Sequence, residues 1–254
     1  QKDLETAGKI QHAILPNPEE ELCAIQQINV CAKMLAAKNV GGDFYDFFVI
    51  DSNRVGLVVA DVSGKGMPAA LFMAVSRTML KSHALQGSSP GEVLEIVNNL
   101  LCKENVSTMF VTIFYGIINI DDGVIQYSNG GHNLPYILRS NGDVEILKKT
   151  RGMGLAIMED MPFETAELRL NPKDVLFMYT DGAPEAMDPN DQLYSDERLA
   201  EFLKLENKSK PIDTIMENLY AEIKAFADGA PQSYDITALM VQYYGGNHKS
   251  CNVI

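Results

Sequence analysis

The sequence has no apolar run long enough to cross a membrane. A transmembrane helix needs about 20 consecutive apolar residues, and the longest apolar stretch, residues 110–120, is interrupted by Thr112 and Gly116. Its β-branched and aromatic residues are typical of a buried strand. We therefore expect no membrane insertion of this segment.

Cysteine is scarce, and its spacing matches no metal or disulfide pattern. The four cysteines are Cys23, Cys31, Cys102 and Cys251, with no CxxC pair and no histidine at zinc-binding spacing. The spacing therefore supports neither a disulfide framework nor a zinc site, and it favours a reduced, cytoplasmic setting. The last four residues, CNVI, have the outline of a prenylation box, but so short a motif also arises by chance. We interpret residues 247–254 as an untethered tail.

Basic residues are few relative to acidic ones. Lys and Arg total 21 against 34 Asp and Glu, which gives a net charge of −13. Such a field repels polyanions, so we expect no nucleic-acid partner. The chain also lacks an initiator Met and a leader at Gln1, which indicates a piece of a longer protein. Its 254 residues and 46% hydrophobic composition predict a globular protein with a sizeable core.

The first 15 residues have the pattern of an amphipathic helix. Leu4, Ala7, Ile10 and Ile14 recur at intervals of three and four, and Pro16 ends the pattern. Such a helix packs on its own domain or on a second copy of the chain. We interpret residues 1–19 as an N-terminal linker or regulatory helix, with a homodimer through this helix as one possibility.

The rest of the chain alternates blocks of strands with helices. Strands are predicted at 24–35, 43–50, 55–62, 108–120, 124–129, 134–139, 143–148, 163–170, 174–180 and 235–244. Helices are predicted at 67–86, with Leu71, Val75 and Met79 on one face, and at 90–104 and 211–227. Short turns predict antiparallel neighbours among the first three strands and a meander over 108–148. This order indicates an α+β protein with antiparallel sheets covered by helices, in one domain over 20–246.

Four aspartates lie at the ends of predicted strands. Asp43 and Asp235 open strands, whereas Asp61 and Asp181 end strongly apolar ones. A carboxylate at such a position is costly to desolvate without a partner, and no Lys or Arg occupies a matching strand end. A divalent cation is a fitting partner, and oxygen ligands without His or Cys favour Mg²⁺ or Mn²⁺ over zinc.

Local turn chemistry offers a different interpretation of each motif taken singly. The carboxylates of Asp61 and Asp181 suit Asx turns as well as metal sites. Gly64-Lys65-Gly66 is no P-loop, because position 59 is Val and Gly66 replaces the required Ser or Thr. His132 fits a turn-stabilising role and a position at the rim of a site equally well. No Gly-x-Ser-x-Gly elbow supports a Ser/His/Asp triad.

Five motifs together resemble one family. They are VGGDFYD at 40–46, ADVSGKGMPAA at 60–70, SNGGHNLP at 128–135, YTDG at 179–182 and YDIT at 234–237. In this order they are similar to the metal-dependent, type 2C (PPM) protein serine/threonine phosphatases, in the bacterial branch of sporulation stage II protein E and the stress-response regulator RsbU. The resemblance covers nearly all of residues 10–244, and residues 10–16 look like a helix that joins such a domain to an upstream sensor.

The resemblance implies a sandwich of two antiparallel sheets flanked by helices, with two Mn²⁺ or Mg²⁺ ions at one edge. Asp61 matches a carboxylate that bridges both ions, and the carbonyl of Val62 matches a backbone ligand. Asp181 matches a further direct ligand, and Asp43 an acid that binds directly or through water. In this family the ions activate a water that attacks phosphorus, so no protein nucleophile is needed.

The sequence departs from the family pattern in its last motif. The first position of that motif is usually an aspartate ligand, and here it is Tyr234, with Asp235 at the second position. A phenol with a pKa near 10 is a poor ligand at neutral pH, so one ion binds weakly or Asp235 substitutes. The arginine of eukaryotic relatives has no counterpart. Lys38 and Lys65 lie close enough in sequence to contact phosphate, although we interpret them as solvated.

The predicted function is hydrolysis of phosphoserine or phosphothreonine on a regulatory protein. By resemblance, the substrate is a phosphorylated anti-sigma-factor antagonist of the STAS type, and an upstream sensor or an activator protein controls the activity. The alternative is a catalytically degenerate domain that binds phosphoproteins, which Tyr234 favours. The intact Asp61 and Asp181 favour the enzyme, because they supply most of the charge that holds the ions.

Overall fold

The structure is a computed structural model that describes residues 2–105, 108–207 and 210–246. The helices are α1 (Lys2–Ile14), α2 (Pro18–Glu21), α3 (Met67–Ala84), α4 (Pro90–Glu104), α5 (Asp196–Glu206) and α6 (Ile212–Ala227). The strands are β1 (Ile28–Leu35), β2 (Phe44–Val49), β3 (Arg54–Val62), β4 (Val111–Asn119), β5 (Val124–Gly130), β6 (Tyr136–Leu138), β7 (Val144–Ile146), β8 (Ala166–Arg169), β9 (Val175–Tyr179) and β10 (Ile236–Tyr243).

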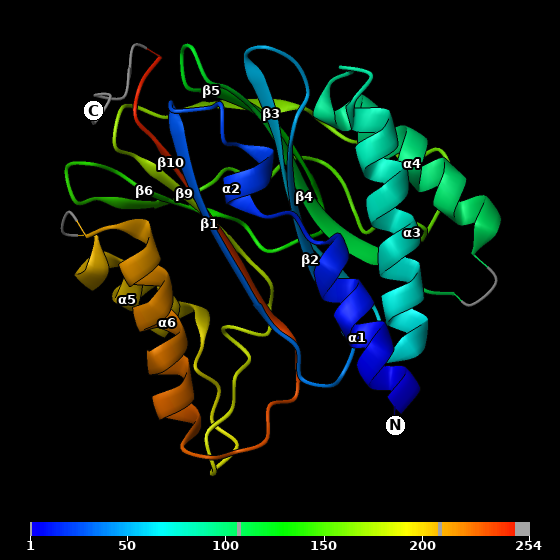
Figure 1. The fold of residues 1–254 in the computed structure, drawn as a ribbon, viewed down its shortest axis with the longest axis vertical. Helices are drawn as coiled ribbons and strands as arrows, with labels where there is room; N and C mark the ends of the chain where they lie inside the picture. Colours follow the sequence, from blue (N-terminus) through cyan, green and yellow to red (C-terminus); the bar gives the residue numbers. More distant parts are fainter. Residues whose placement is uncertain (1, 106–107, 208–209, 247–254) are drawn as a thin grey trace.

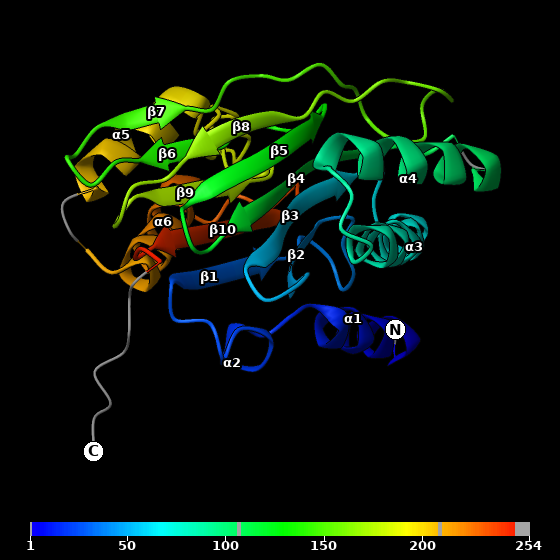
Figure 2. The same cartoon turned by 90° about the horizontal axis from the view of Figure 1, so that it is seen from above.

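These strands form two five-stranded antiparallel sheets. One sheet has the order β1-β10-β9-β6-β7 and the other β2-β3-β4-β5-β8. The helices α3 and α4 cover the sheet that contains β2 and β3, whereas α5 and α6 cover the sheet that contains β1 and β10 (Figures 1 and 2). The predicted fold class, a sandwich of two antiparallel sheets flanked by helices, is confirmed.

Three apolar clusters fill the spaces between these four layers. The central cluster joins the two sheets and includes Phe47, Leu57 and Phe114 from one sheet and Met178 and Leu239 from the other. A second cluster lies under α3 and α4, and a third under α5 and α6. Both sheets are therefore buried on both faces, which explains the nearly continuous apolar runs of β3, β4, β9 and β10.

Most predicted elements agree with the structure to within a few residues, but two predicted strand pairings are wrong. The chain does not form a meander over 108–148, because it crosses to the other sheet between β5 and β6. β1 pairs with β10 rather than with β2. Turn signals such as Asn141-Gly142 specify a local hairpin, here between β6 and β7. They do not specify which sheet the following strand joins.

The helix α5, which follows the acidic turn region, is absent from the elements predicted from the sequence. Ser195 caps this helix by accepting a hydrogen bond from the backbone N–H of Arg198, and Leu199, Phe202 and Leu203 form its buried face. These apolar residues follow the helical spacing of three and four. The signal was therefore present in the sequence.

The face of α3 that packs on the sheet also differs from the expected one. Leu71 and Val75 are 62% and 43% exposed, whereas Met73 and Leu80 are buried. This helix is apolar on several sides, so periodicity alone does not identify its inner face.

The helix α1 packs on its own domain, with Ile14 of the predicted apolar stripe against the cluster under α3 and α4, but much of the contact lies outside that stripe. Its buried residues are Gly8 and Gln11, whereas Leu4 and Ile10 are 40% and 60% exposed. Gly8 permits this packing because a Cβ at this position would collide with the carbonyl of Asn39. The homodimer expected through this helix stays a prediction.

The described cysteines, Cys23, Cys31 and Cys102, form no disulfide. Within the described ranges, no helix combines the length and the apolar character needed to cross a membrane. The CNVI motif at the end of the chain and the predicted tail, residues 247–254, lie outside the described residues.

Candidate metal centre

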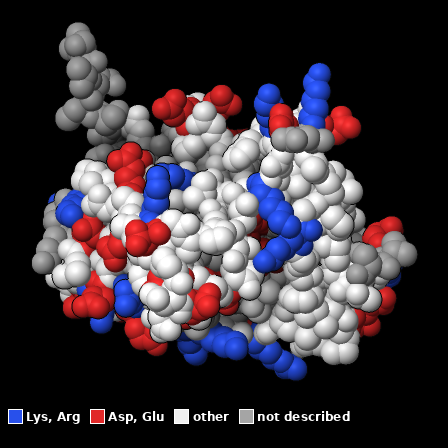
Figure 3. All heavy atoms as spheres, turned by 90° about the horizontal axis from the view of Figure 1, so that it is seen from below, with Lys and Arg blue, Asp and Glu red and all other residues white. Residues whose placement is uncertain are grey.

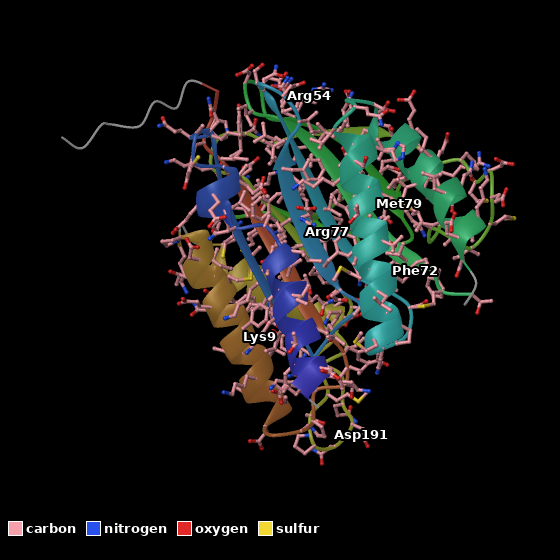
Figure 4. The ribbon with its side chains drawn as sticks, turned by 45° about the vertical axis from the view of Figure 1, so that its right-hand side comes forward. Lys9, Arg54, Phe72, Arg77, Met79 and Asp191 are labelled. Atoms are coloured by element: carbon pink, nitrogen blue, oxygen red, sulfur yellow. The ribbon has the colours of Figure 1, made fainter. Side chains whose placement is uncertain are left out.

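The register of β2 and β3 brings two aspartates together. Phe44 pairs with Ala60 in this antiparallel ladder, so Asp43, just before Phe44, and Asp61, just after Ala60, lie at the same end. Figure 4 shows Arg54, at the start of β3, at the opposite end of the molecule. The site therefore lies at the end of the sandwich where β3 finishes and β2 begins.

The second sheet contributes two aspartates at the same end of the sandwich. Tyr179, the last residue of β9, pairs with Ala238 of β10, which leaves Asp181 just beyond β9 and Asp235 just before β10. Figure 3 looks onto this end of the molecule, where basic side chains stand beside acidic ones near the middle of the face. Neither sheet alone assembles the four carboxylates.

All the predicted site residues line one cavity of about 140 Å³. The predicted ligands among them are Asp43, Asp61, Val62, Asp181 and Asp235. Tyr234, Lys38 and Lys65 line it too, as do the glycines that follow Asp61. Asp46, the second acid of the VGGDFYD motif, lies elsewhere, since it is buried against α3 with its Oδ2 at 3.0 Å from Nε of Arg77 (Figure 4).

Asp43 is almost fully buried and held by a hydroxyl from the other sheet. The Oγ1 of Thr180 donates to its Oδ2 at 2.6 Å, and the same Oγ1 accepts the backbone N–H of Thr237. Burial and the nearby carboxylates of Asp61 and Asp235 raise the pKa of Asp43 well above its usual value. Without a cation, this acid retains its proton more readily than an exposed aspartate.

Asp61 is the second acid whose charge is strongly disfavoured. Burial, followed by the carboxylates of Asp181, Asp235 and Glu185, raises its pKa to about 7, and a hydrogen bond with Asp43 opposes this shift. Burial also raises the pKa of Asp181, which Lys65 and a backbone hydrogen bond from Gly182 partly oppose. The cavity is therefore a cluster of mutually repelling carboxyl groups that a cation would stabilise.

Asp235 anchors the loop that precedes Asp43. Its Oδ1 accepts the backbone N–H of Ala37 and its Oδ2 that of Gly42, both at 2.8 Å. Each oxygen retains a second lone pair that an ion can use. Asp235 therefore combines a structural role with a position on the cavity wall.

Glycines permit the close packing around these acids. A Cβ at Gly41 would collide with the carboxylate of Asp235, and one at Gly182 would collide with the backbone carbonyl of Asp235. A Cβ at Gly42 would lie 2.7 Å from the carbonyl oxygen of Val62, the predicted backbone ligand. These glycines let three separate loops converge on the cavity.

Tyr234, at the usual ligand position of the family, is paired with Lys65. The Lys65 Nζ lies 4.2 Å from the centre of the Tyr234 ring and donates a hydrogen bond to the carbonyl of Ser233 at 2.9 Å. Lys65 is therefore anchored at the cavity, which differs from the solvated lysine predicted from the sequence. The ring of Tyr234 offers this cation a π face.

The chemistry of the donors fits a hard divalent ion. The cavity is lined by carboxylates and a backbone carbonyl, with no His or Cys among its described lining residues. Oxygen donors of this kind suit Mg²⁺ and Mn²⁺. Across residues 2–105, 108–207 and 210–246, however, no three acidic, His or Cys side chains converge closely enough to form an ion site by themselves. The ligand set therefore remains a prediction.

Several residues that support this site were missed from the sequence. Thr180 lies within the YTDG motif and Glu185 three residues after it, and both act on the acids of the cavity. Gln11 of α1 contacts Gly41 with both ends of its amide, donating to the carbonyl at 2.7 Å and accepting the N–H at 3.0 Å. His132 is not at the rim of the cavity, because it is only 7% exposed and is not among the residues that line it.

Comparison with known proteins supports the resemblance. The model of the family described as stage II sporulation protein E (SpoIIE) matches residues 51–244. Protein IcfG of Synechocystis sp. is 31% identical over 94% of this chain and 41% of its own length. The phosphoserine phosphatase RsbU of Bacillus subtilis is 29% identical over 74% of this chain and 55% of its own length. The chain thus spans about half the length of these relatives.

The fold also matches solved structures. The SiaA-PP2C domain of Pseudomonas aeruginosa superposes with a TM-score of 0.81 at 21% sequence identity. The match covers 95% of this chain and 96% of that domain. At this level of identity the match establishes the fold, and the chemistry rests on the residues of the cavity.

Proposed function

The chain belongs to the SpoIIE family, and we propose that it is a metal-dependent phosphatase that hydrolyses phosphoserine or phosphothreonine on a regulatory protein. The observation that carries this proposal is the cavity at the end of the sandwich, where Asp43, Asp61, Asp181 and Asp235 converge from both sheets. The family relationship to a phosphoserine phosphatase gives this acidic cavity its chemical interpretation.

The residues of the cavity fall into metal ligands and residues that orient those ligands. Asp43, Asp61, Asp181 and the carbonyl of Val62 would hold two Mn²⁺ or Mg²⁺ ions, with Asp235 as a further candidate. When bound, the ions supply Lewis-acid activation of water and neutralise charge on the phosphoryl group. Thr180 keeps Asp43 oriented by its 2.6 Å hydrogen bond. Proton loss from Asp61, whose pKa is raised to about 7, accompanies metal binding near neutral pH.

The partners follow from the family resemblance. We propose a phosphorylated anti-sigma-factor antagonist of the STAS type as the substrate, and an upstream sensor or an activator protein as the regulator. The position of α1 supports regulation from the N-terminal side, since Gln11 contacts the loop that leads to Asp43. The cytoplasm, where such regulators act, is the proposed location.

Dephosphorylation of a phosphoserine protein, measured with and without Mn²⁺, tests this function. We expect Mn²⁺-dependent phosphate release by the unmodified chain and none by Asp61→Asn. Asp191→Asn, at an exposed position that does not line the cavity, is the matched control and should retain full activity. Equal activity in the unmodified chain and Asp61→Asn would contradict the proposed role of the metal site.

Tyr234 supports a second candidate function, a phosphatase-like domain that binds phosphoproteins without hydrolysing them. The ammonium of Lys65 packs on the Tyr234 ring where the family usually has a carboxylate ligand. Tyr234→Asp restores that carboxylate. Activity that appears only in Tyr234→Asp would favour the binding function, whereas activity in the unmodified chain favours the enzyme.

A further inference from the structure

His132 lies between the two sheets and contacts both of them. It follows β5 in the loop 131–135, and its side chain is 7% exposed. Asn129 fixes this loop, because its Oδ1 accepts the backbone N–H of His132 at 2.7 Å and its Nδ2 donates to the His132 carbonyl at 3.0 Å. Both the position and the orientation of the imidazole are therefore determined by the fold.

Each ring nitrogen of His132 contacts a different sheet. Nε2 lies 3.0 Å from the carbonyl oxygen of Tyr179 at the end of β9, and Nδ1 lies 2.9 Å from Oγ1 of Thr112 in β4. A carbonyl only accepts, so Nε2 carries the hydrogen, and in a neutral ring Nδ1 then accepts from the Thr112 hydroxyl. Burial lowers the pKa of His132 to about 4, which keeps the ring neutral at physiological pH.

The two residues that His132 joins are neighbours of two acids of the cavity. Thr112 pairs with Asp61 in the β3–β4 ladder, and this pairing links it to the Asp61 backbone while its hydroxyl proton is donated to His132. Tyr179 precedes Asp181 by two residues. The imidazole thus connects the backbone beside Asp61 in one sheet to the backbone beside Asp181 in the other.

We propose that His132 is a positioning residue that sets the spacing between Asp61 and Asp181 across the sandwich. This inference rests on the proposed function of those two carboxylates as metal ligands. Asp61 lies near the end of β3 in one sheet, Asp181 follows β9 in the other, and both line the cavity. A hydrogen-bonded bridge between the strands beside them holds the spacing that an ion bound by both carboxylates requires.

Mn²⁺ binding, measured by the loss of the electron paramagnetic resonance signal of free Mn²⁺, tests this role without any substrate. His132→Leu removes both polar contacts at similar bulk, and Thr112→Val removes one of them. We expect at least tenfold weaker Mn²⁺ binding by either variant, with melting of the metal-free protein showing that each remains folded. An affinity within twofold of the unmodified chain, in a folded variant, would overturn the proposal.

Conservative variants separate positioning from general packing. Thr112→Ser retains the hydroxyl, and His132→Gln retains an N–H donor and an acceptor, so both should recover most of the lost affinity. In the double variant of His132→Leu and Thr112→Val, the loss of Mn²⁺ affinity should equal the larger of the two single losses, because both residues act through one bridge. Additive losses would contradict a shared bridge. Should His132→Leu fail to fold, the Thr112 pair carries the test.

The outcome also distinguishes this inference from the proposed function. If Mn²⁺ affinity depends on the His132 bridge but the chain releases no phosphate, the positioning role stands and the phosphatase function is contradicted. A chain that binds no Mn²⁺ would contradict both.

Discussion

Asp61 illustrates how a single residue links the chemistry of the cavity to the stability of the chain. Its carboxyl is buried among other acids, which raises its pKa from the ordinary value of 3.8 to about 7. The folded chain therefore binds a proton that the unfolded chain releases between these two pH values. The stability associated with this proton is fully present below about pH 4 and is lost as the pH rises through 7.

This linkage predicts how the metal-free protein responds to pH. We expect its melting temperature to fall between pH 5.5 and pH 8, because Asp61 must ionise within a repulsive cluster. Asp61→Asn should melt with a smaller dependence on pH and at a higher temperature at pH 8. Thermal unfolding in a chelator, at constant ionic strength, provides the measurement. If Asp61→Asn and Asp191→Asn had the same dependence on pH, Asp61 would not be the group responsible.

Gly182 gives a second prediction at this scale. A Cβ at this position would collide with the backbone carbonyl of Asp235, so Gly182→Ala should cost about 1–3 kcal/mol of stability through overpacking. It should also weaken Mn²⁺ binding by displacing Asp181. Gly116→Ala is the comparison, because its added Cβ would meet no atom closer than 3.4 Å. Denaturant unfolding of both variants checks the difference, and equal stabilities would count against the close packing.

The aspartates of the site were predictable from sequence, and their supporting residues were not. Each aspartate stands at the end of an apolar strand beside glycine or a short turn, which is a local signal. Thr180 acts on Asp43, 137 residues away in sequence, and Gln11 acts on Gly41, 30 residues away. Such pairs depend on how the two sheets stack, and no local pattern encodes that arrangement.

At the scale of elements, α1 is the clearest case of a helix that contributes to the site without lining it. It places Gln11 on Gly41, two residues before Asp43, while Asp235 holds the other side of the same loop. The loop is therefore fixed by a helix on one side and by the last motif of the chain on the other.

We expect Gln11→Ala to destabilise the protein by about 1–3 kcal/mol, because two backbone groups of Gly41 lose a buried partner. Phosphatase activity and Mn²⁺ affinity should fall as the loop before Asp43 loosens. Lys9→Ala, an exposed position on the same helix, is the matched control and should leave both unchanged (Figure 4). Melting curves and Mn²⁺ titrations of the two variants distinguish these results. Unchanged Mn²⁺ affinity in Gln11→Ala would show that α1 does not support the metal site.

The element types were largely predictable, whereas their partners were not. The helix α4 has the predicted bounds because Ser89, Pro90 and Glu92 form strong start signals, and Glu92 completes a capping box with Ser89. The pairing of β1 with β10 joins residues about 200 positions apart. Short turns suggested nearer neighbours, and the burial of apolar faces on both sheets determined the actual order.

At the scale of the whole molecule, the two sheets meet at an end that carries concentrated negative charge within a chain of net charge −13. Metal binding to the folded state alone should therefore stabilise the entire domain. At a free Mn²⁺ concentration of about 100 times the dissociation constant, the free energy of unfolding should rise by about 2.7 kcal/mol. For a domain of this size that corresponds to roughly 5–10 °C in melting temperature.

A thermal scan with Mn²⁺, with Mg²⁺ and with sodium chloride at matched ionic strength checks this expectation. Sodium chloride screens the net charge but does not bind the cavity, so its effect should be smaller. Addition of a chelator should reverse the effect of the divalent ions. If divalent ions raised the melting temperature of Asp61→Asn by the same amount, the stabilising ions would bind elsewhere on the surface.

The contact between Gln11 and Gly41 makes α1 sensitive to rotation as well as to position. Successive residues of an α-helix point about 100° apart around its axis, since 3.6 residues complete a turn. A rotation of α1 by one residue step would replace the amide of Gln11 with the side chain of Ile10 or His12, neither of which can bracket both backbone groups of Gly41. The support of the loop that leads to Asp43 therefore depends on which face α1 turns toward Gly41.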